Sequence, residues 1–332
     1  MTTIRDVAKR AGVSVSTVSR AINGMVFVDE TTRNRVLEAI NELNYQPNYL
    51  AKGLKIGKTN TLCLLIPSIR NPSINILARG VEDASRRNGF TLILCNTDED
   101  KAIEKLYIEK MLSNWVDGII YCTATKNGGI LEYLRSINYP VVLALREYDD
   151  KFDTFCVDNF MGGYIATKYL IEKGFKRICI LTGRLDLNLY SDRLRGYQKA
   201  LNDYGISYNQ EFVISAKECD KANIEFDPKI DFVMKRKVKP DSFFATGDLI
   251  AINAVNEMRK IGIRVPEDVS IIGFDDIDIS PLTYPSLTTV SQPLYEIGIR
   301  SAERLIKRIR NVDKVEPELF KFKAQIIQRE SA

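Results

Sequence analysis

From residue 61 onward, short apolar segments alternate with longer segments of helical periodicity, and this alternation limits the possible folds more than any other feature. The predicted strands are 61–67, 90–96, 118–122, 140–145, 155–158, 177–182, 212–215, 242–246 and 269–274. The predicted helices include 74–88, 104–114, 163–173, 192–204 and 250–261. Most of these strands are apolar throughout, as expected when helices cover both faces of a parallel sheet. The pattern predicts an α/β core of two doubly wound halves.

The positive charge of the chain is concentrated in residues 1–58. These carry nine Lys and Arg against five Asp and Glu, and the net charge of the whole 332-residue chain is +4. The remainder of the chain is therefore electrically balanced. Such an asymmetry indicates an anionic partner for the basic segment, with nucleic acid as the leading candidate.

Two short helices joined by a tight turn are predicted at the start of this basic segment. The first spans 4–11, and Thr3 and Asp6 occupy the two positions of a capping box. Gly12 ends this helix, because glycine readily adopts the left-handed conformation found at helix C-termini. The second helix spans 15–22 after a turn of about three residues, which predicts a helix-turn-helix.

A third helix, predicted over 30–43 and capped by Asp29 or Thr31, would complete a small three-helix core. The second helix would then direct its polar side outward, with Val15, Ser16, Thr17, Ser19 and Arg20. Hydroxyl groups suit phosphate contacts, and an arginine can donate two hydrogen bonds to a guanine edge. A helical hairpin that only packs against other helices is the alternative.

The composition excludes most catalytic chemistry. The chain has no His, so Ser-His-Asp triads, Cys-His pairs and His-ligated zinc are impossible. Nucleotide-binding glycine motifs and the Gly-x-Ser-x-Gly elbow are also absent. Asp275, Asp276 and Asp278 are compatible with a metal site, but carboxylates in a loop are more often solvated or bonded to a ligand. We expect no catalytic residue, no metal and no cofactor, and hence not an enzyme.

The cysteines and the N-terminus indicate the compartment. Six cysteines occur without a Cys-x-x-Cys pair, and all but Cys219 lie in apolar strand-like segments, as buried free thiols do in a reducing compartment. The N-terminus has no apolar leader, and no apolar segment is long enough to span a membrane. We therefore expect a cytoplasmic protein that is not bound to a membrane.

Residues 3–24, TIRDVAKRAGVSVSTVSRAING, resemble the DNA-binding headpiece of the lactose/galactose-repressor family. The resemblance implies two kinds of DNA contact. Bases would be read by Val15, Ser16 and Arg20, and the DNA backbone would be contacted by Thr17, Ser19 and Asn23.

Residues 45–55, YQPNYLAKGLK, are similar to the hinge of the same family. The resemblance implies that Leu54 wedges between base pairs in the minor groove, with Lys55 and Ala51 beside it. An apolar wedge unstacks a base step and bends the duplex, while a cation offsets the phosphate charge of the groove. A flexible linker is the alternative reading of this segment.

The rest of the chain is similar to the family core, through VDN at 157–159, RLRGY at 193–197, ATGD at 245–248, VPEDVSIIGFD at 265–275 and LTTVSQP at 287–293. The resemblance implies a periplasmic-binding-protein-like core with an effector bound between two subdomains. The implied effector-binding residues are Arg193, Asp275, Asp158, Ser73, Ile74 and Asp248. A structural ion pair is the alternative for Arg193 and Asp275.

Together these features predict a DNA-binding transcriptional regulator, of the repressor kind, controlled by a small effector. Leu187 and Leu189 replace the polar residues of a purine-binding member, so we expect a sugar or sugar derivative. The partners would be a pseudo-palindromic double-stranded operator and a second copy of the chain, because a twofold dimer requires matched half-sites. A solute-binding protein and an α/β enzyme with the same core are the alternatives.

The expected domain boundaries follow from the same resemblance. They are a headpiece at 1–46, a hinge and linker at 47–60, and a core at 61–332. Within the core, an N-terminal subdomain would contain 61–160 and 291–321, and a C-terminal subdomain 161–290 and 322–332. Residues 293–310 would then form a helix of the N-terminal subdomain, and 323–329 a returning strand.

Overall fold

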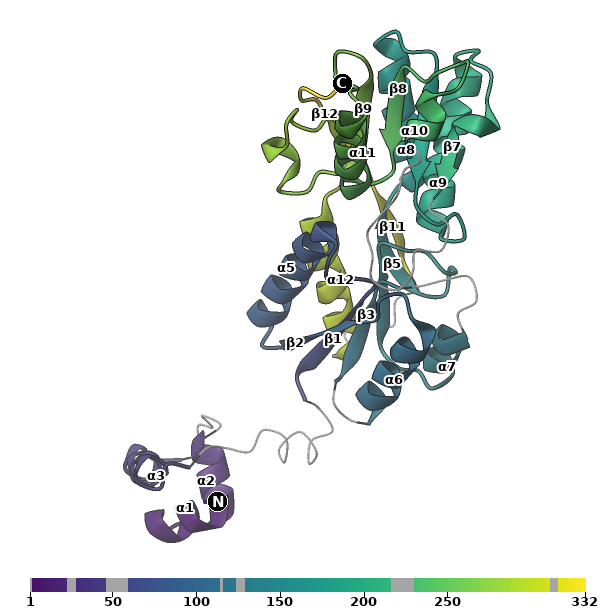
Figure 1. Ribbon diagram of the computed structural model, residues 1–332. Coiled ribbons are helices and arrows are strands. Elements are labelled where there is room, and N and C mark those ends of the chain that lie inside the picture. Colours follow the sequence, from purple (N-terminus) through teal and green to yellow (C-terminus); the bar gives the residue numbers. More distant parts are fainter. Residues whose placement is uncertain are drawn as a thin grey trace. The chain divides into compact units, whose positions relative to one another are not determined.

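The computed structural model describes residues 2–22, 28–45, 59–113, 116–123, 129–215, 230–310 and 316–332. Contacts divide the chain into two units, Met1–Thr59 and Asn60–Ala332, which we call the headpiece and the core (Figure 1). None of the helices within the described ranges is long and apolar enough to cross a membrane.

The headpiece contains three helices, α1 (Ile4–Ala11), α2 (Val15–Ile22) and α3 (Glu30–Glu42). The bounds of the first two are those predicted, and the third ends one residue earlier. All three bury small apolar side chains against one another, namely Val7, Ala8, Ala11, Val18, Ala21, Val36 and Ala39. Such small residues allow the helices to approach closely. Because α2 packs through one side only, its opposite face remains in solvent.

Local hydrogen bonds set the ends of these helices. The Thr3 side chain accepts from the backbone of Asp6, and the Asp6 carboxylate accepts from the Thr3 backbone at 2.8 Å, so the predicted capping box is present. Gly12 has the expected left-handed φ of 67°. Asp29 caps α3 by accepting from Thr32 N, whereas the Thr31 hydroxyl donates to Asp29 and does not itself cap the helix.

The first sheet of the core is entirely parallel, in the order β11-β5-β4-β3-β1-β2. Its strands are β1 (Thr61–Ile66), β2 (Thr91–Asn96), β3 (Gly118–Tyr121), β4 (Val141–Ala144), β5 (Asp153–Val157) and β11 (Leu319–Phe322). Helices α5 (Pro72–Arg87) and α12 (Leu294–Ile309) bury their apolar sides against one face. Helices α6 (Lys101–Leu112) and α7 (Gly129–Ser136) cover the other face.

The second sheet has the order β12-β10-β9-β8-β6-β7 and is parallel except for β12, which runs antiparallel to β10. Its strands are β6 (Ile178–Thr182), β7 (Val213–Ser215), β8 (Ser242–Ala245), β9 (Ser270–Asp275), β10 (Thr289–Ser291) and β12 (Gln325–Ile327). Helices α8 (Asn159–Glu172) and α9 (Asn188–Asp203) pack on one face. Helices α10 (Ile230–Met234) and α11 (Asp248–Lys260) pack on the other.

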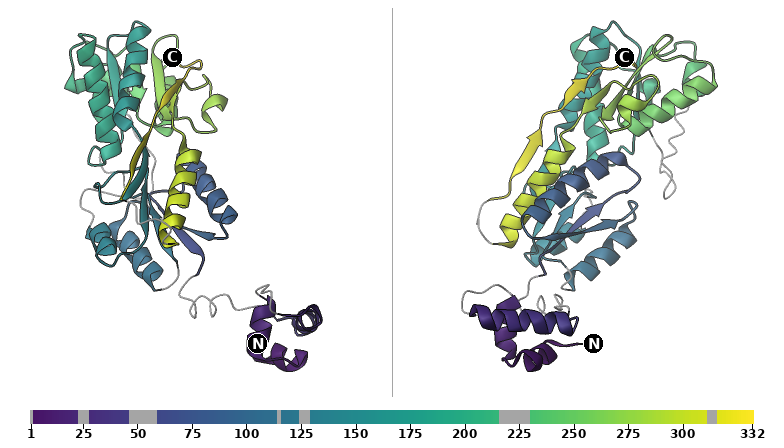
Figure 2. Two further views of the ribbon diagram at one scale, coloured as in Figure 1. Left: turned by 180° about the vertical axis from the view of Figure 1, so that it is seen from behind. Right: turned by 90° about the vertical axis from the view of Figure 1, so that its left-hand side faces the viewer.

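The chain passes between the two sheets three times. It leaves the first sheet after β5, returns after β10 by way of α12, and leaves again after β11 to form β12. Both views in Figure 2 show β11 and β12 as a continuous yellow path from one sheet to the other. The two subdomains are therefore each built from segments that are distant in the sequence.

Pairs of glycines bring two helix pairs unusually close. A Cβ added at Gly298 of α12 would lie 2.3 Å from the Leu77 carbonyl oxygen of α5, and one at Gly80 would lie 2.2 Å from the Tyr295 carbonyl oxygen. Each helix thus uses a glycine to accommodate the other helix's backbone. Gly163 and Gly196 play the same reciprocal role between α8 and α9.

The sequence did not predict four short elements. These are α7, α10, β10 and β11, which span between three and eight residues. Periodicity is weak over so few residues, and the β11 sequence alternates exposed and half-buried side chains because it lies at the edge of its sheet. The five described cysteines are buried and free, as expected.

Candidate functional site

One face of α2 remains in solvent and carries the predicted DNA-reading residues. Val18 and Ala21 point into the headpiece core, while Val15, Ser16, Ser19 and Arg20 are exposed and Thr17 is half-buried. The described part of the headpiece thus presents hydroxyl groups and a guanidinium from one side of one helix.

The start of α2 is held by Ser14. Its Oγ accepts from Thr17 N at 3.1 Å and shares hydrogen bonds with the hydroxyls of Ser16 and Thr17 at 2.7 and 2.8 Å. This network sets the orientation of the hydroxyls on the exposed face. The predicted contacts Asn23, Ala51, Leu54 and Lys55 lie outside the described residues.

Arg193 is a buried guanidinium at the carboxyl ends of the second sheet's strands. It is 3% exposed, its Nε donates to Asn159 Oδ1 at 2.9 Å, and its Nη1 donates to the Thr246 carbonyl oxygen at 2.6 Å. The guanidinium stacks 3.5 Å from the centre of the Phe274 ring. These contacts fix the plane of the guanidinium, which is a precondition for directional recognition of a ligand.

Asp275 is the partner of Arg193, although the two are not in close contact. Asp275 Oδ1 lies 4.0 Å from Arg193 Nη1 and accepts from Gln292 Nε2 at 2.6 Å. Burial raises the pKa of Asp275 to about 7, against the opposing charge of Arg193. Burial likewise lowers the pKa of Arg193, and the Asp275 charge opposes that change. Gln292 lies between β10 and α12, so this carboxylate is bonded to a segment that crosses between the sheets.

A second buried ion pair comes from the first sheet. Arg146 lies in the loop after β4 and is 6% exposed. Both of its Nη atoms donate to the carboxylate of Glu99, which lies in the loop after β2. Sequence analysis missed both residues. The available signal was their position, since ligands of parallel α/β sheets bind at the carboxyl ends of strands.

Tyr190 of α9 has its ring centre 5.8 Å from Arg193 Cζ. Burial raises its pKa, and the charges of Arg193, Asp275, Arg146 and Glu99 all act on it. One direct hydrogen bond also joins the two halves, from Asn188 Nδ2 to the Glu147 carbonyl oxygen at 2.7 Å. We call the five residues Glu99, Arg146, Tyr190, Arg193 and Asp275 the inter-sheet site.

The backbone around this site is strained. Among the described residues, every positive-φ residue other than Gly and Asn lies at the end of β2, β4 or β9 or in the loop that follows. These residues are Asp98, Glu99, Leu145, Asp275 and Asp276. Their φ values run from 50° to 126°. Left-handed conformations are costly for such side chains and cluster at ligand-binding sites, which supports a binding role for these loops.

Three other predicted effector residues are used within the fold. Asp158 caps α8 by accepting from Met161 N at 2.9 Å. Ser73 is buried at the start of α5 and donates to Asn71 Oδ1 at 2.9 Å. Ile74 belongs to the apolar core between α5 and the first sheet. The structure does not bring these side chains into the charged cluster.

Asp248 was predicted to contact the effector, but its side chain has a structural role. It is fully buried, and its two oxygens accept from Ile277 N, Ser280 Oγ and Thr289 Oγ1 at 3.0, 2.6 and 2.5 Å. Three protein donors leave this carboxylate occupied, so we assign Asp248 to holding the loop between β9 and β10 beside Asp275.

The aspartates after β9 have partners other than a metal. Asp276 pairs with Arg329 at 2.6 Å, and Asp275 accepts from Gln292. In the part of the chain that the structure describes, no three His, Cys, Asp or Glu side chains form a group that could hold a metal ion.

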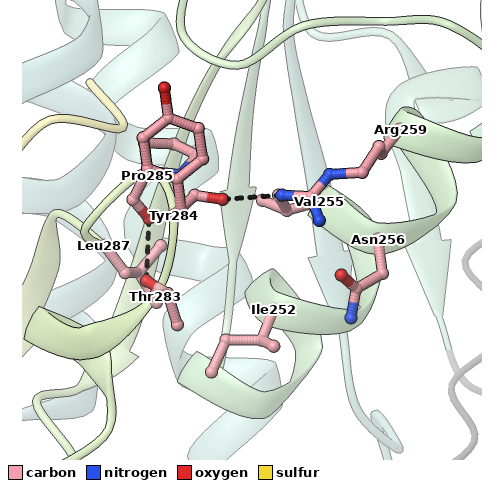
Figure 3. A pocket seen from close by; sticks show the side chains of 8 residues that line it. All are labelled: Ile252, Val255, Asn256, Arg259, Thr283, Tyr284, Pro285 and Leu287. Atoms are coloured by element: carbon pink, nitrogen blue, oxygen red, sulfur yellow. Dashed lines mark hydrogen bonds between the residues drawn. The ribbon is translucent and has the colours of Figure 1, made fainter.

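A separate cavity of about 200 Å³ lies between α11 and the loop before β10. Its lining residues are Ile252, Val255, Asn256, Arg259, Thr283, Tyr284, Pro285 and Leu287 (Figure 3). Arg259 donates to the Tyr284 carbonyl oxygen at 2.9 Å and so anchors the loop. No residue of the inter-sheet site lines this cavity.

Comparison with known proteins matches both units of the chain. Residues 3–48 match the model for bacterial regulatory proteins of the lacI family, and residues 167–332 match a periplasmic binding protein-like domain. The HTH-type transcriptional regulator RegA of Clostridium saccharobutylicum is 36% identical over 332 residues, covering 99% of each chain. The HTH-type transcriptional repressor PurR of Aliivibrio fischeri (strain MJ11) is 36% identical over 334 residues, covering 100% of this chain and 98% of its own.

Solved structures extend the similarity to the whole fold. A complex of the transcriptional regulator CelR with cellobiose is 28% identical with a TM-score of 0.74, and the match covers all of both chains. A lac repressor dimer bound to operator and the anti-inducer ONPF is 23% identical, with a TM-score of 0.85 over 99% of this chain and 98% of that one. At this lower identity the second match shows the fold.

Proposed function

The chain belongs to the lacI family of bacterial regulatory proteins, and from that premise we propose which residues read its operator and which kind of ligand controls it. It is a DNA-binding transcriptional regulator rather than an enzyme. The alternatives of a solute-binding protein and of an α/β enzyme have no support, since relatives matched over their whole length are regulators.

Operator reading is assigned to the exposed face of α2. Val15, Ser16 and Arg20 would contact base edges in the major groove, and Thr17, Ser19 and Asn23 the phosphates. The observation that carries this assignment is that α2 buries Val18 and Ala21 and exposes the polar side. Ala51, Leu54 and Lys55 would contact the minor groove.

Replacing Arg20 by Ala should weaken discrimination at one base position of each half-site by about 1–3 kcal/mol. A selection of binding sites from random DNA, performed with wild type and Arg20→Ala, would measure it. Arg10→Ala is the matched control, because Arg10 is exposed on α1 but pairs with Glu42 at 2.7 Å. An unchanged sequence preference in Arg20→Ala would contradict the assignment.

The effector is proposed to be a sugar or sugar derivative held at Arg193 and Asp275, with Arg146 and Glu99 opposite them. The observation that carries it is that each sheet places a buried, hydrogen-bonded guanidinium and a carboxylate at the carboxyl ends of its strands. Fixed donors and acceptors of both kinds suit a ligand with several hydroxyl groups. A similar structure was solved with cellobiose, which supports the class of ligand.

A thermal-shift screen of the whole chain against sugars, sugar phosphates, polyols and nucleobases would test the ligand class. A ligand at a hundredfold excess over its Kd stabilises the folded state by about 2.7 kcal/mol. We expect a sugar to raise the Tm and the rise to disappear in Arg193→Ala. A rise that persists in Arg193→Ala, or one produced only by nucleobases, would contradict the proposal.

The proposed domain limits are those expected from the sequence, with the hinge at 47–60 and the subdomains joined at the three crossings. Effector binding would shift the population of subdomain arrangements and hence the operator affinity. We place the protein in the cytoplasm, where its operator DNA lies.

A homodimer is proposed to form partly through the loop before β10. Leu282 and Tyr284 are 80% and 85% exposed, and Tyr284 lines the cavity of Figure 3. Large apolar side chains exposed to this degree mark a contact surface. A second copy is the proposed occupant, because a pseudo-palindromic operator needs two linked headpieces.

A further inference from the structure

We infer that Asn188 is a positioning residue that clasps the two halves of the inter-sheet site together. Its Nδ2 donates to the Glu147 carbonyl oxygen of the other subdomain at 2.7 Å. The consequence for effector binding rests on the proposed function, whereas the clasp itself does not.

The clasp lies next to the charged residues of both halves. Asn188 is the first residue of α9, the helix that carries Tyr190 and Arg193. Glu147 directly follows Arg146, which is bonded to Glu99. The hydrogen bond from Asn188 to Glu147 therefore joins the start of α9, which carries Tyr190 and Arg193, to the loop that carries Arg146.

The accepting side of the clasp is anchored. Leu145, in a left-handed conformation, donates from its backbone N to the Phe155 carbonyl oxygen at 2.9 Å. The Glu147 carboxylate accepts from Lys321 Nζ at 2.9 Å. Phe155 lies on β5 and Lys321 on β11, the strands that precede two of the crossings between the sheets. The loop that contains Glu147 is thus bonded to both of these strands.

The local structure of α9 supports an inter-subdomain role for the Asn188 side chain. Asparagine near a helix start usually bonds to its own helix, as Asn71 does at α5. The N-cap residue of α9 is instead Leu187, and no side chain caps this helix. The Asn188 amide is directed away from its helix and toward the opposite subdomain.

Charged groups of one half also act on titratable groups of the other half near this hydrogen bond. The Arg184 hydrogen bond is the main cause that lowers the pKa of Asp186, and the charge of Arg146 adds to it from the other subdomain. Arg146 and Glu99 also act on Tyr190. A hydrogen bond that favours the effector-binding arrangement of the two halves would raise the apparent effector affinity.

Asn188→Asp separates this role from a structural one. The substitution removes the donor and places a carboxylate against the Glu147 carbonyl oxygen, but an acidic residue in the first turn favours the helix itself. The variant is measured by hydrogen–deuterium exchange of the full chain without effector. We expect the exchange rate of the backbone amides at 145–149 and 186–192 to rise about fivefold or more, because one hydrogen bond is lost. The Tm should not fall.

Asn188→Ala is the second variant, and Asn202→Ala, exposed near the other end of α9, is the control. Faster exchange at 145–149 in both Asn188 variants, and wild-type exchange in Asn202→Ala, would support the clasp. Wild-type exchange at 145–149 in both Asn188 variants would overturn it, as would a uniform rise across the whole second subdomain. Neither DNA nor effector is present in this measurement, so an unchanged exchange rate would leave the proposed regulator function intact. Conversely, an unchanged sequence preference in Arg20→Ala would leave the clasp intact.

Discussion

The Asp275 carboxyl group is buried, and burial outweighs the favourable charge of Arg193 at 4.0 Å. Its pKa is raised from 3.8 to about 7. Between those pH values the folded state holds a proton that the unfolded state has lost, so this group makes stability fall as the pH rises. The cost is complete above about pH 7 and absent below about pH 4.

Asp275→Asn should remove this pH dependence. The free energy of unfolding of the variant, relative to wild type, should increase from about pH 5 to about pH 8 by roughly 2 kcal/mol, given about 1.4 kcal/mol per pKa unit. Urea unfolding of the full chain at both pH values measures it. A relative stability that is equal at the two pH values would show that Asp275 is not the group responsible.

At the scale of secondary-structure elements, the helix pair α5 and α12 depends on two glycines. A methyl group at Gly298 would lie 2.3 Å from a backbone oxygen, and helix backbones cannot yield as a flexible side chain can. The two helices cover one face of the first sheet, so moving them apart also exposes the core beneath them.

Gly298→Ala should therefore lower the free energy of unfolding by about 1–3 kcal/mol, as overpacking does in other cores. Gly129→Ala is the matched control, since a Cβ at that position on α7 meets nothing within 4 Å. Chemical denaturation of both variants measures the difference. Equal stability of the two variants would mean that α5 and α12 separate without cost.

At the scale of the whole molecule, the proposed dimer links two headpieces that each recognise half of an operator. Removing the link should weaken operator binding greatly, because the second headpiece loses its high effective concentration. The surface to change is the exposed loop beside the cavity of Figure 3.

The double substitution Leu282→Glu and Tyr284→Lys should convert the dimer to a monomer and reduce operator affinity by about 100-fold or more. Light scattering coupled to size exclusion gives the mass, and a gel-shift titration gives the affinity. Phe232→Lys is the control, since Phe232 is also strongly exposed, at 61%. A double variant that stays dimeric would place the dimer contact elsewhere on the molecule.

The sequence by itself determined the parts of this protein that depend on neighbouring residues. The Thr3–Asp6 capping box, Gly12 and the apolar spacing of α1 and α2 lie within a few residues of one another, so local propensities specify the helix-turn-helix. The apolar strands of the core were predictable for the same reason, as was their parallel arrangement.

The tertiary structure alone decided the composition of the inter-sheet site. Its contacts join residues that are more than forty positions apart in the sequence. Glu99 meets Arg146 only when the strands of the first sheet pair, and Asn188 meets Glu147 only when the chain has also crossed between the sheets. It also decided that Asp248 is occupied by three protein donors and that Asp275 is not. Burial and hydrogen-bond partners arise from packing between distant segments, and a sequence specifies the residue types without stating which of them packing will place together.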